Sequence, residues 1–246
     1  MWVAGRALAA LLLVGAAWLV YDFASSIRFQ VQTVHVRGNL LLSQADVETA
    51  ASVVGANIFW VNRADVAARL RALPLVQSVQ VSAMLPDTLD IQIVERQPAG
   101  FWTSGDQTYL VDREGVILKA VDAETAQIRA CAGQPCDAQV AALPSVAEAQ
   151  PEPLMPGEHV DPNALRTSAE LATLLPSVGV QPLGFQWSAD TGLDVATAEG
   201  WHARFDQAGD LPGQVATLGA VRAELARSKV PAGLIDVRFG ERPYFR

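Results

Sequence analysis

The chain offers few side chains at spacings that support chemistry. Its three histidines, His35, His159 and His202, lie far apart, and none has the His-x-x-x-His or Cys/His spacing of common metal sites. A Gly-x-Ser-x-Gly nucleophile motif and a phosphate-binding glycine loop are also missing from the sequence. Glu95 and Arg96 are adjacent, and we interpret them as a solvated strand end where Arg96 meets a nearby carboxylate. The sequence therefore predicts no enzyme activity and no metal or cofactor site.

Two cysteines, Cys131 and Cys136, stand within residues 121–160, a stretch rich in Ala, Pro and Gln. If this part of the chain lies outside the cytoplasm, the two thiols either close a small disulfide loop or stay as two free thiols. The stretch shows no steady periodicity, and long structureless loops are uncommon in compact domains. We therefore expect a loop insertion over 121–160 that surrounds a strand near Leu143.

Length and charge narrow the class of protein. The chain has 246 residues, half of them apolar, which is enough for two modest domains. Its formal net charge is -8, and its lysines and arginines are not clustered. Because contacts with phosphate groups need clustered positive charge, the composition excludes a general nucleic-acid binder. No pattern in the sequence predicts a small-molecule substrate.

An apolar run at residues 7–21 lies between Arg6 and Asp22 and contains no charge. Fifteen helical residues reach only ~22 Å, short of a ~30 Å hydrocarbon core, but the run becomes long enough if its flanking residues are counted. We predict a transmembrane helix over 7–25, with residues 1–6 as a short cytoplasmic tail and the rest of the chain outside. The alternative is a signal peptide that is cleaved after Ser26.

Residues 27–97 follow the order strand, helix, helix, strand, strand. A first strand alternates through Val34 and Val36, and a helix begins at its N-cap Ser43 and is expected to continue to Gly55 with Val54 on its apolar face. A second helix is expected over 64–73, followed by two alternating strands. This order predicts a compact α+β module with one face of its sheet covered.

Residues 98–246 read as a mixed β-domain with two helices. A hairpin is expected over 109–118, a helix from the N-cap Asp161, three short strands, and a second helix over about 212–228. The buried stripe predicted for the first helix comprises Leu165, Ala169, Ala172 and Leu175.

The closing stretch from residue 233 alternates apolar and polar residues and predicts a terminal strand that runs to Phe239. We expect Ile235 and Val237 in the core. Pro243 cannot donate a ladder hydrogen bond, which favours an edge position for this strand. An apolar edge with aromatic residues nearby can accept a strand from another chain.

A second aromatic segment, "NIFWVN", joins the two helices of the first module. Ile58, Phe59 and Trp60 either pack between the helices or form an exposed aromatic edge that meets another membrane protein.

These motifs resemble a known family. "FQVQTVHVRGN", "NIFWVN" and "LPDTLDIQIVERQP" resemble a POTRA domain of the FtsQ type, and "YLVDREGVIL" and "IDVRF" resemble strands of the FtsQ/DivIB β-domain. A POTRA domain alone also fits an accessory protein of protein export or outer-membrane assembly, which is the alternative. That alternative needs a membrane β-barrel, and the helices predicted after residue 98 speak against it.

The resemblance implies a function and partners. FtsQ/DivIB proteins are single-pass inner-membrane proteins of the division septum that scaffold other proteins without being enzymes. By this resemblance the chain would gather FtsB (also called DivIC) and FtsL, connect them to the septal synthase FtsW/FtsI, and contact other division proteins such as FtsK through the POTRA domain. Phe59 and Trp60 are the candidate residues for a secondary contact with another membrane protein. The terminal region that would receive FtsB comprises Arg238, Phe239, Gly240, Glu241 and Tyr244. Family members often have longer cytoplasmic tails, so the true start could lie upstream.

Overall fold

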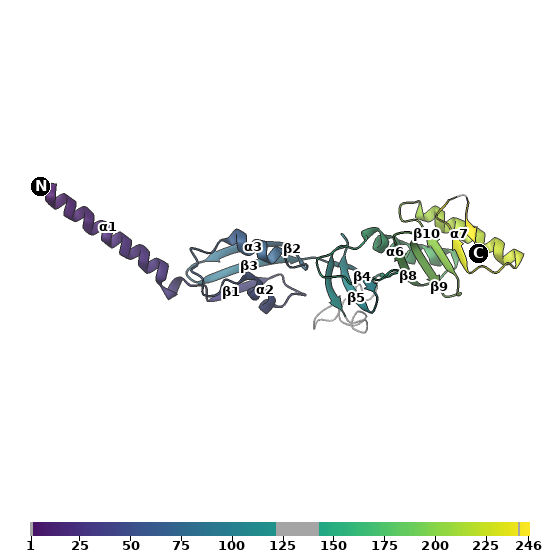
Figure 1. Cartoon of the computed structure of the whole chain (residues 1–246), viewed down its shortest axis with the longest axis horizontal. Coiled ribbons are helices and arrows are strands. Elements are labelled where there is room, and N and C mark those ends of the chain that lie inside the picture. Colours follow the sequence, from purple (N-terminus) through teal and green to yellow (C-terminus); the bar gives the residue numbers. More distant parts are fainter. Residues whose placement is uncertain (1, 122–142, 241) are drawn as a thin grey trace. The chain divides into compact units, whose positions relative to one another are not determined.

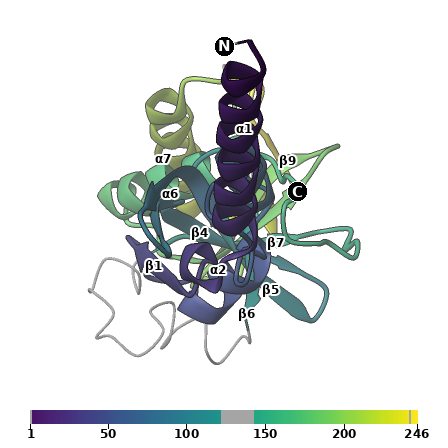
Figure 2. The ribbon, with the colours of Figure 1, turned by 90° about the vertical axis from the view of Figure 1, so that its left-hand side faces the viewer.

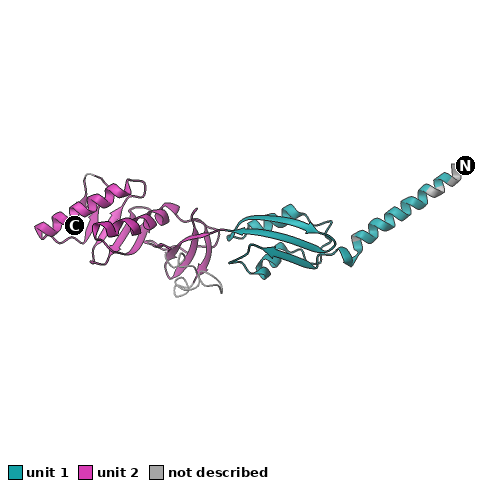
Figure 3. Cartoon of the chain, turned by 180° about the vertical axis from the view of Figure 1, so that it is seen from behind, with its two compact units in different colours: residues 1–95 teal, residues 96–246 magenta. Residues whose placement is uncertain are grey.

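A computed structural model of the protein describes residues 2–121, 143–240 and 242–246. The chain divides into two compact units, residues 1–95 and 96–246 (Figure 3). Cys131, Cys136 and Glu241 lie outside the described residues, so the disulfide stays a prediction and Glu241 has no described position.

The first unit begins with a long helix, α1 (Trp2–Ser25), followed by a short 3-10 helix, η1 (Ile27–Phe29) (Figure 1). Residues 7–25, which the sequence predicts to span a membrane, lie within α1. In the part of the chain that the structure describes, no helix combines the length and the apolar character needed to cross a membrane.

The rest of the first unit is a three-stranded sheet with two helices, in the predicted order. The sheet order is β1 (Thr33–Arg37), β3 (Thr88–Glu95) and β2 (Val76–Met84), and the helices are α2 (Gln44–Ala51) and α3 (Arg63–Arg71). The central strand β3 pairs parallel with β1 and antiparallel with β2. Alternate residues of β3 are buried, as predicted: Leu89, Ile91 and Ile93. The helices also bury apolar side chains: Val47, Val66 and Leu70. The fold is therefore the expected α+β module.

The start of α2 agrees with the prediction and its end does not. Ser43 caps the helix and forms a capping box with Asp46, whose backbone N–H lies 3.1 Å from the Ser43 hydroxyl oxygen. The helix ends at Ala51 because Ser52 adopts a left-handed conformation with φ of 48°. Val54 therefore lies outside the helix and is 64% exposed.

Glu95 is buried, so its interpretation as a solvated residue is wrong. Its carboxylate accepts hydrogen bonds from the backbone N–H groups of Leu40, Leu41 and Leu42 at 2.9, 2.8 and 2.9 Å. A buried carboxylate is favourable only when its oxygens are paired, and these three donors supply that pairing. The predicted carboxylate contact of Arg96 is confirmed, since Arg96 donates to Asp112 at 2.7 Å and also to Glu114.

The described residues of the second unit form one nine-stranded mixed sheet. Its order is β12 (Tyr244–Phe245), β11 (Leu234–Asp236), β10 (His202–Phe205), β9 (Gly192–Thr197), β8 (Pro182–Ser188), β7 (Ser145–Glu148), β4 (Pro98–Ser104), β5 (Gln107–Asp112) and β6 (Ile117–Val121). Three neighbouring pairs are parallel, namely β4 with β7, β7 with β8, and β10 with β11. Parallel neighbours need a crossover, and in the last two of these pairs a helix lies between the two strands. β7 is the strand expected near Leu143.

These two crossover helices are α6 (Pro162–Leu174), which continues into η2 (Leu175–Val178), and α7 (Leu211–Ser228). In Figure 2 both lie to the same side of the strands. The N-cap Asp161 is confirmed by its side chain, which accepts from the N–H of Asn163 at 2.9 Å. The predicted buried stripe of α6 is partly wrong. Leu165 and Leu175 are buried, but Ala169 and Ala172 are exposed and the helix instead buries Ala164, Thr167, Ser168 and Leu171.

Candidate functional site

The C-terminal strand differs from the prediction in length and position. β11 contains only Leu234–Asp236, and Arg238 and Phe239 lie in the turn that follows it. β11 is not at the edge, because β12 pairs with it antiparallel, with Asp236 opposite Tyr244. Ile235 and Val237 are buried at 2% and 0% exposure, as expected. Among the described strands, β12 is the outermost on this side of the sheet.

The register of β12 determines which of its backbone groups face outward. The Arg246 N–H donates to the Leu234 carbonyl at 3.1 Å, and the Arg246 carbonyl accepts from the Leu234 N–H at 3.0 Å. In an antiparallel pair, residues that exchange such bonds alternate with residues whose backbone groups point to the other side. The N–H and C=O of Phe245 therefore point away from β11. The strand therefore offers one outward donor and one outward acceptor, both at Phe245.

The turn between β11 and β12 is held by an ion pair inside it. Arg238 binds the carboxylate of Asp236 with its Nε at 3.0 Å from Oδ1 and a terminal nitrogen at 2.6 Å from Oδ2, and it also donates to the Thr191 carbonyl. Burial raises the pKa of the Asp236 carboxyl, but hydrogen bonds from Arg238 and the charges of Arg238 and Arg204 outweigh burial and bring the pKa below its ordinary value. Arg238 therefore positions the turn.

Three aromatic side chains of this region are exposed, namely Phe239, Tyr244 and Phe245. Phe239 is 64% exposed and lies beside the Arg238 guanidinium, whose central carbon is 5.2 Å from the ring centroid. Tyr244 is 55% exposed on β12. Gly240 follows Phe239 with φ of +58°, a left-handed conformation that glycine adopts without strain. The residues predicted for partner contact therefore separate into a partly buried positioning group, Arg238, and an exposed surface. We call β12 together with Phe239 the C-terminal edge.

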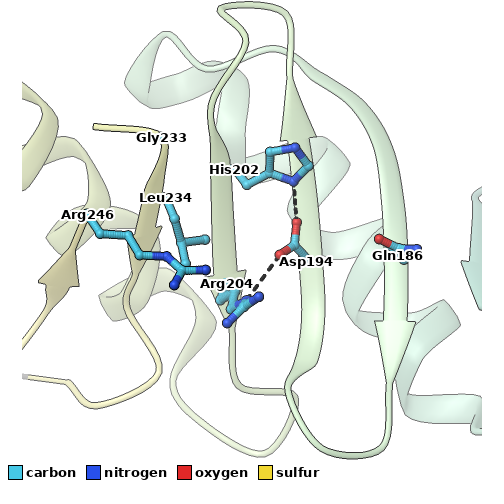
Figure 4. A pocket seen from close by; sticks show the side chains of 7 residues that line it. All are labelled: Gln186, Asp194, His202, Arg204, Gly233, Leu234 and Arg246. Carbon is cyan, nitrogen blue, oxygen red and sulfur yellow. Dashed lines mark hydrogen bonds and ion pairs between the residues drawn. The ribbon is translucent and has the colours of Figure 1, made fainter. Parts of the chain in front are cut away.

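An open hollow of about 440 Å³ adjoins the C-terminal edge on the face of the sheet (Figure 4). Asp194 lies at its centre, with one carboxylate oxygen 2.6 Å from Nδ1 of His202 and the other 3.1 Å from Nε of Arg204. Its lining residues come from β8 to β11 and from the segment around β12: Gln186, Asp194, His202, Arg204, Gly233, Leu234 and Arg246. Of the two arginines that line the hollow, Arg204 is already paired with Asp194, and Arg246 is the other.

The sequence reasoning missed this hollow. The signal was present, because Asp194 alternates with the buried residues Leu193 and Val195, and Arg204 alternates with Ala203 and Phe205. The polar faces of two neighbouring strands meet on the same side of a sheet. Pairing β9 with β10 in the observed register, with Arg204 opposite Asp194, would have brought the charges together.

The segment at residues 57–60 is a second exposed region. Ile58 is buried at 4% exposure, but Phe59 is 48% and Trp60 71% exposed, so packing between the helices is wrong for these two aromatic residues. Among the described residues, no group of histidine, cysteine or acidic side chains could hold a metal ion.

Comparisons with known proteins find relatives of the FtsQ or DivIB type. Residues 29–96 match the family model described as "POTRA domain, FtsQ-type". The chain is 32% identical over 196 residues to the cell division protein FtsQ of Chloroflexus aurantiacus, an alignment that covers 79% of this chain and 67% of that protein. It is 34% identical over 128 residues to FtsQ of Caulobacter vibrioides, covering 51% and 42%, and 28% identical over 92 residues to DivIB of Clostridium acetobutylicum, covering 37% of each chain. The chain thus spans about two thirds of the Chloroflexus protein and less of the others.

Proposed function

Because the chain belongs to the FtsQ/DivIB family of cell division proteins, we propose that it is a non-enzymatic scaffold that receives a strand of another division protein at β12. The observation that carries this proposal is the outward N–H and C=O of Phe245 on the outermost described strand of this side of the sheet. Exposed strand edges attract further strands, and β-augmentation uses this attraction for recognition. A partner strand would extend the sheet through two hydrogen bonds to Phe245.

The surroundings of β12 favour particular side chains on that partner strand. Tyr244 and Phe239 present apolar rings that can cover apolar side chains of the partner. The hollow adjoins the same edge, and the Arg246 guanidinium that lines it favours an acidic side chain. Arg238 would contribute indirectly by fixing the turn, since its guanidinium is already bound to Asp236.

The proposed partners follow from the family. The strand would come from an FtsB/DivIC-like protein together with an FtsL-like protein, and through them the scaffold would connect to the septal synthase FtsW/FtsI. The POTRA unit would contact FtsK. We further propose that α1 attaches the chain to the inner membrane, with its N-terminus in the cytoplasm and the remaining residues outside. The exposed apolar side chains of α1 support this attachment: Leu11, Leu12, Leu13, Val14, Trp18, Leu19 and Val20.

A proline at the outward position tests the strand proposal. Phe245→Pro removes the outward N–H of β12 and leaves the N–H of Arg246, which bonds to β11, in place. The expected result is loss of most binding when full-length variant and wild type are titrated with the purified FtsB/DivIC-like protein of the same cell. The matched control, Phe245→Ala, keeps the donor and should retain more binding than the proline variant.

A second variant tests the exposed side chains around β12 separately from the backbone of the strand. Phe239→Glu places a charge on the exposed ring position without touching the backbone of β12, and we expect it to weaken binding. Wild-type affinity in Phe245→Pro, with an unchanged circular dichroism spectrum, would refute strand addition at β12. Wild-type affinity in both variants would show that the partner does not bind at the C-terminal edge.

A further inference from the structure

Three phenylalanine rings join the end of α1 to the segment Asn57–Trp60, which we call the aromatic loop. Phe23, in the last turn of α1, stacks on Phe29 with ring centroids 4.9 Å apart. Phe59 of the loop contacts both rings, with centroids 5.2 Å from Phe29 and 6.1 Å from Phe23. Aromatic pairs at these separations are favourable beyond the area they bury. The aromatic loop is therefore attached to the end of α1 by its side chains.

Hydrogen bonds fix the same arrangement and occupy the backbone of the loop. The side-chain amide of Asn57 donates to the Phe23 carbonyl at 3.0 Å, and the Ile58 N–H donates to the Phe29 carbonyl at 2.8 Å. The N–H groups of Phe59 and Trp60 donate to the side-chain and backbone oxygens of Asn57, respectively. The loop thus presents side chains to its surroundings while these backbone donors are already satisfied within it.

The exposed surface here is apolar and continues that of α1. Trp60 is 71% exposed. Other large apolar or aromatic side chains on both sides of the helix end are exposed to a similar degree: Trp18 at 68%, Tyr21 at 69% and Ile27 at 70%. Asp22 and Arg28, the charged residues on either side of this end of the helix, carry opposite charges. An apolar surface with one acidic and one basic residue beside it, next to an apolar helix, fits a partner surface that is itself apolar and extended.

We infer that the aromatic loop sits in the headgroup region of the lipid bilayer to which α1 attaches, with Trp60 as its main contact. This inference rests on the proposed membrane attachment of α1. Tryptophan favours the membrane interface, because its ring is apolar and its indole N–H can still bond to water or headgroups. A lipid surface is favoured over a protein partner because it covers α1 and the loop together and needs no backbone hydrogen bonds. The loop would hold the first unit against the membrane at one end of its sheet.

The opposite end of the same sheet provides a matched control. Leu40 is 77% exposed and follows the end of β1, where Glu95 of β3 binds its N–H. The aromatic loop bonds to Phe29, which precedes β1. The five residues of β1 lie between these two ends and span roughly 16 Å. A probe at Leu40 is therefore equally accessible but lies away from the proposed lipid contact.

The test uses a polarity-sensitive fluorophore on full-length protein. In a Cys131→Ser, Cys136→Ser background, the fluorophore is attached to Trp60→Cys, Leu40→Cys or, as a second probe beside the loop, Ile27→Cys. Each protein is reconstituted into vesicles of phosphatidylethanolamine and phosphatidylglycerol. We expect emission at positions 60 and 27 to shift to shorter wavelength and iodide quenching to fall several-fold, also at high salt. Position 40 should change little.

Two measurements distinguish failure of the loop inference from failure of the proposed membrane attachment by α1. Flotation of the labelled chain on a density gradient reports attachment itself. A chain that does not float with the vesicles overturns both the attachment by α1 and the inference. A chain that floats, with positions 60 and 27 as open to iodide as position 40, overturns the inference alone. Protection of position 60 only after another division protein is added would also overturn it, because the loop would then be a protein contact.

Discussion

The two exposed aromatic regions of the molecule carry similar side chains in different backbone contexts. In the aromatic loop, the N–H groups of Ile58, Phe59 and Trp60 are bonded within the first unit. At the C-terminal edge, the N–H and C=O of Phe245 point away from the sheet. A surface whose backbone donors are already bonded suits a non-directional partner such as lipid, whereas a strand edge demands a partner with a defined direction and register. The backbone, more than the aromatic content, separates the two roles.

The two regions also differ in what holds them in place. Rings and the neutral amide of Asn57 fix the aromatic loop. The turn beside β12 depends on a carboxylate and a guanidinium, Asp236 and Arg238. Charged hydrogen bonds are stronger than neutral ones and fail when one partner is lost or protonated. The comparison therefore predicts that the C-terminal edge is the more sensitive of the two to mutation and to pH.

The largest effect is expected from Asp236→Ala. This change leaves Arg238, whose side chain is 22% exposed, without its carboxylate and removes the hydrogen bonds that shape the turn. We expect the free energy of unfolding of the second unit to fall by about 2 to 4 kcal/mol, since breaking a largely buried ion pair leaves an uncompensated charge. Urea unfolding gives this value, and hydrogen exchange should show faster exchange at residues 234–246 and no change at residues 57–60.

A matched control for this variant lies in the same unit. Glu224→Ala removes an exposed ion pair with Arg227 on α7, and it should cost about 0.5 kcal/mol or less. Equal destabilisation by the two variants would show that the Asp236 pair does not hold the turn. Slower or unchanged hydrogen exchange at β12 in Asp236→Ala would contradict the prediction that the C-terminal edge is the more sensitive of the two regions.

The stability of the C-terminal edge, and not that of the aromatic loop, should depend on pH. The effect should be smaller than that of Asp236→Ala. The pKa of Asp236 in the folded protein is below the ordinary value of about 3.9, so its contribution to stability is present above that pH and is lost as pH falls toward the lower folded value. The difference in melting temperature between wild type and Asp236→Asn should therefore narrow below about pH 4. A difference that stays constant down to pH 2.5 would rule out the carboxylate as the titrating group.

The local pattern of the sequence was enough for much of the fold. Alternation predicted the buried face of β3, and Ser43 and Asp161 predicted where α2 and α6 begin. The errors occur where distant contacts decide. Glu95 looks solvated beside Arg96, yet the backbone of residues 40–42, more than fifty positions earlier, buries and pairs it. Periodicity cannot reveal such a partner.

The same limit applied to the candidate site. The alternating residues 234–239 predicted one terminal strand at an edge, but Asp236 draws Arg238 into a turn and so ends β11, and β12 then covers it. The edge of the sheet is therefore β12, one strand further out than the strand that the sequence predicted. The hollow was missed because it forms only when β9 and β10 are placed in register. Exposure of Phe59 and Trp60 remained one of two alternatives, since an apolar segment between helices fits either.

The smallest effect is expected in the aromatic loop, from Asn57→Ala. The change removes the bond from the Asn57 side chain to the Phe23 carbonyl and the bond that the side chain accepts from the Phe59 N–H, both 3.0 Å long. These are neutral and partly exposed, so we expect a loss of about 1 to 2 kcal/mol, independent of pH between 3 and 7. Hydrogen exchange at Phe59 should accelerate while residues 234–246 keep their protection. Asn62→Ala is the control, because it removes the bond from Asn62 to the Ala64 N–H at the start of α3 without touching the link to α1. If Asn62→Ala frees the Phe59 amide as much as Asn57→Ala does, the loop is held by the folding of α3 and the link to α1 contributes nothing to its position.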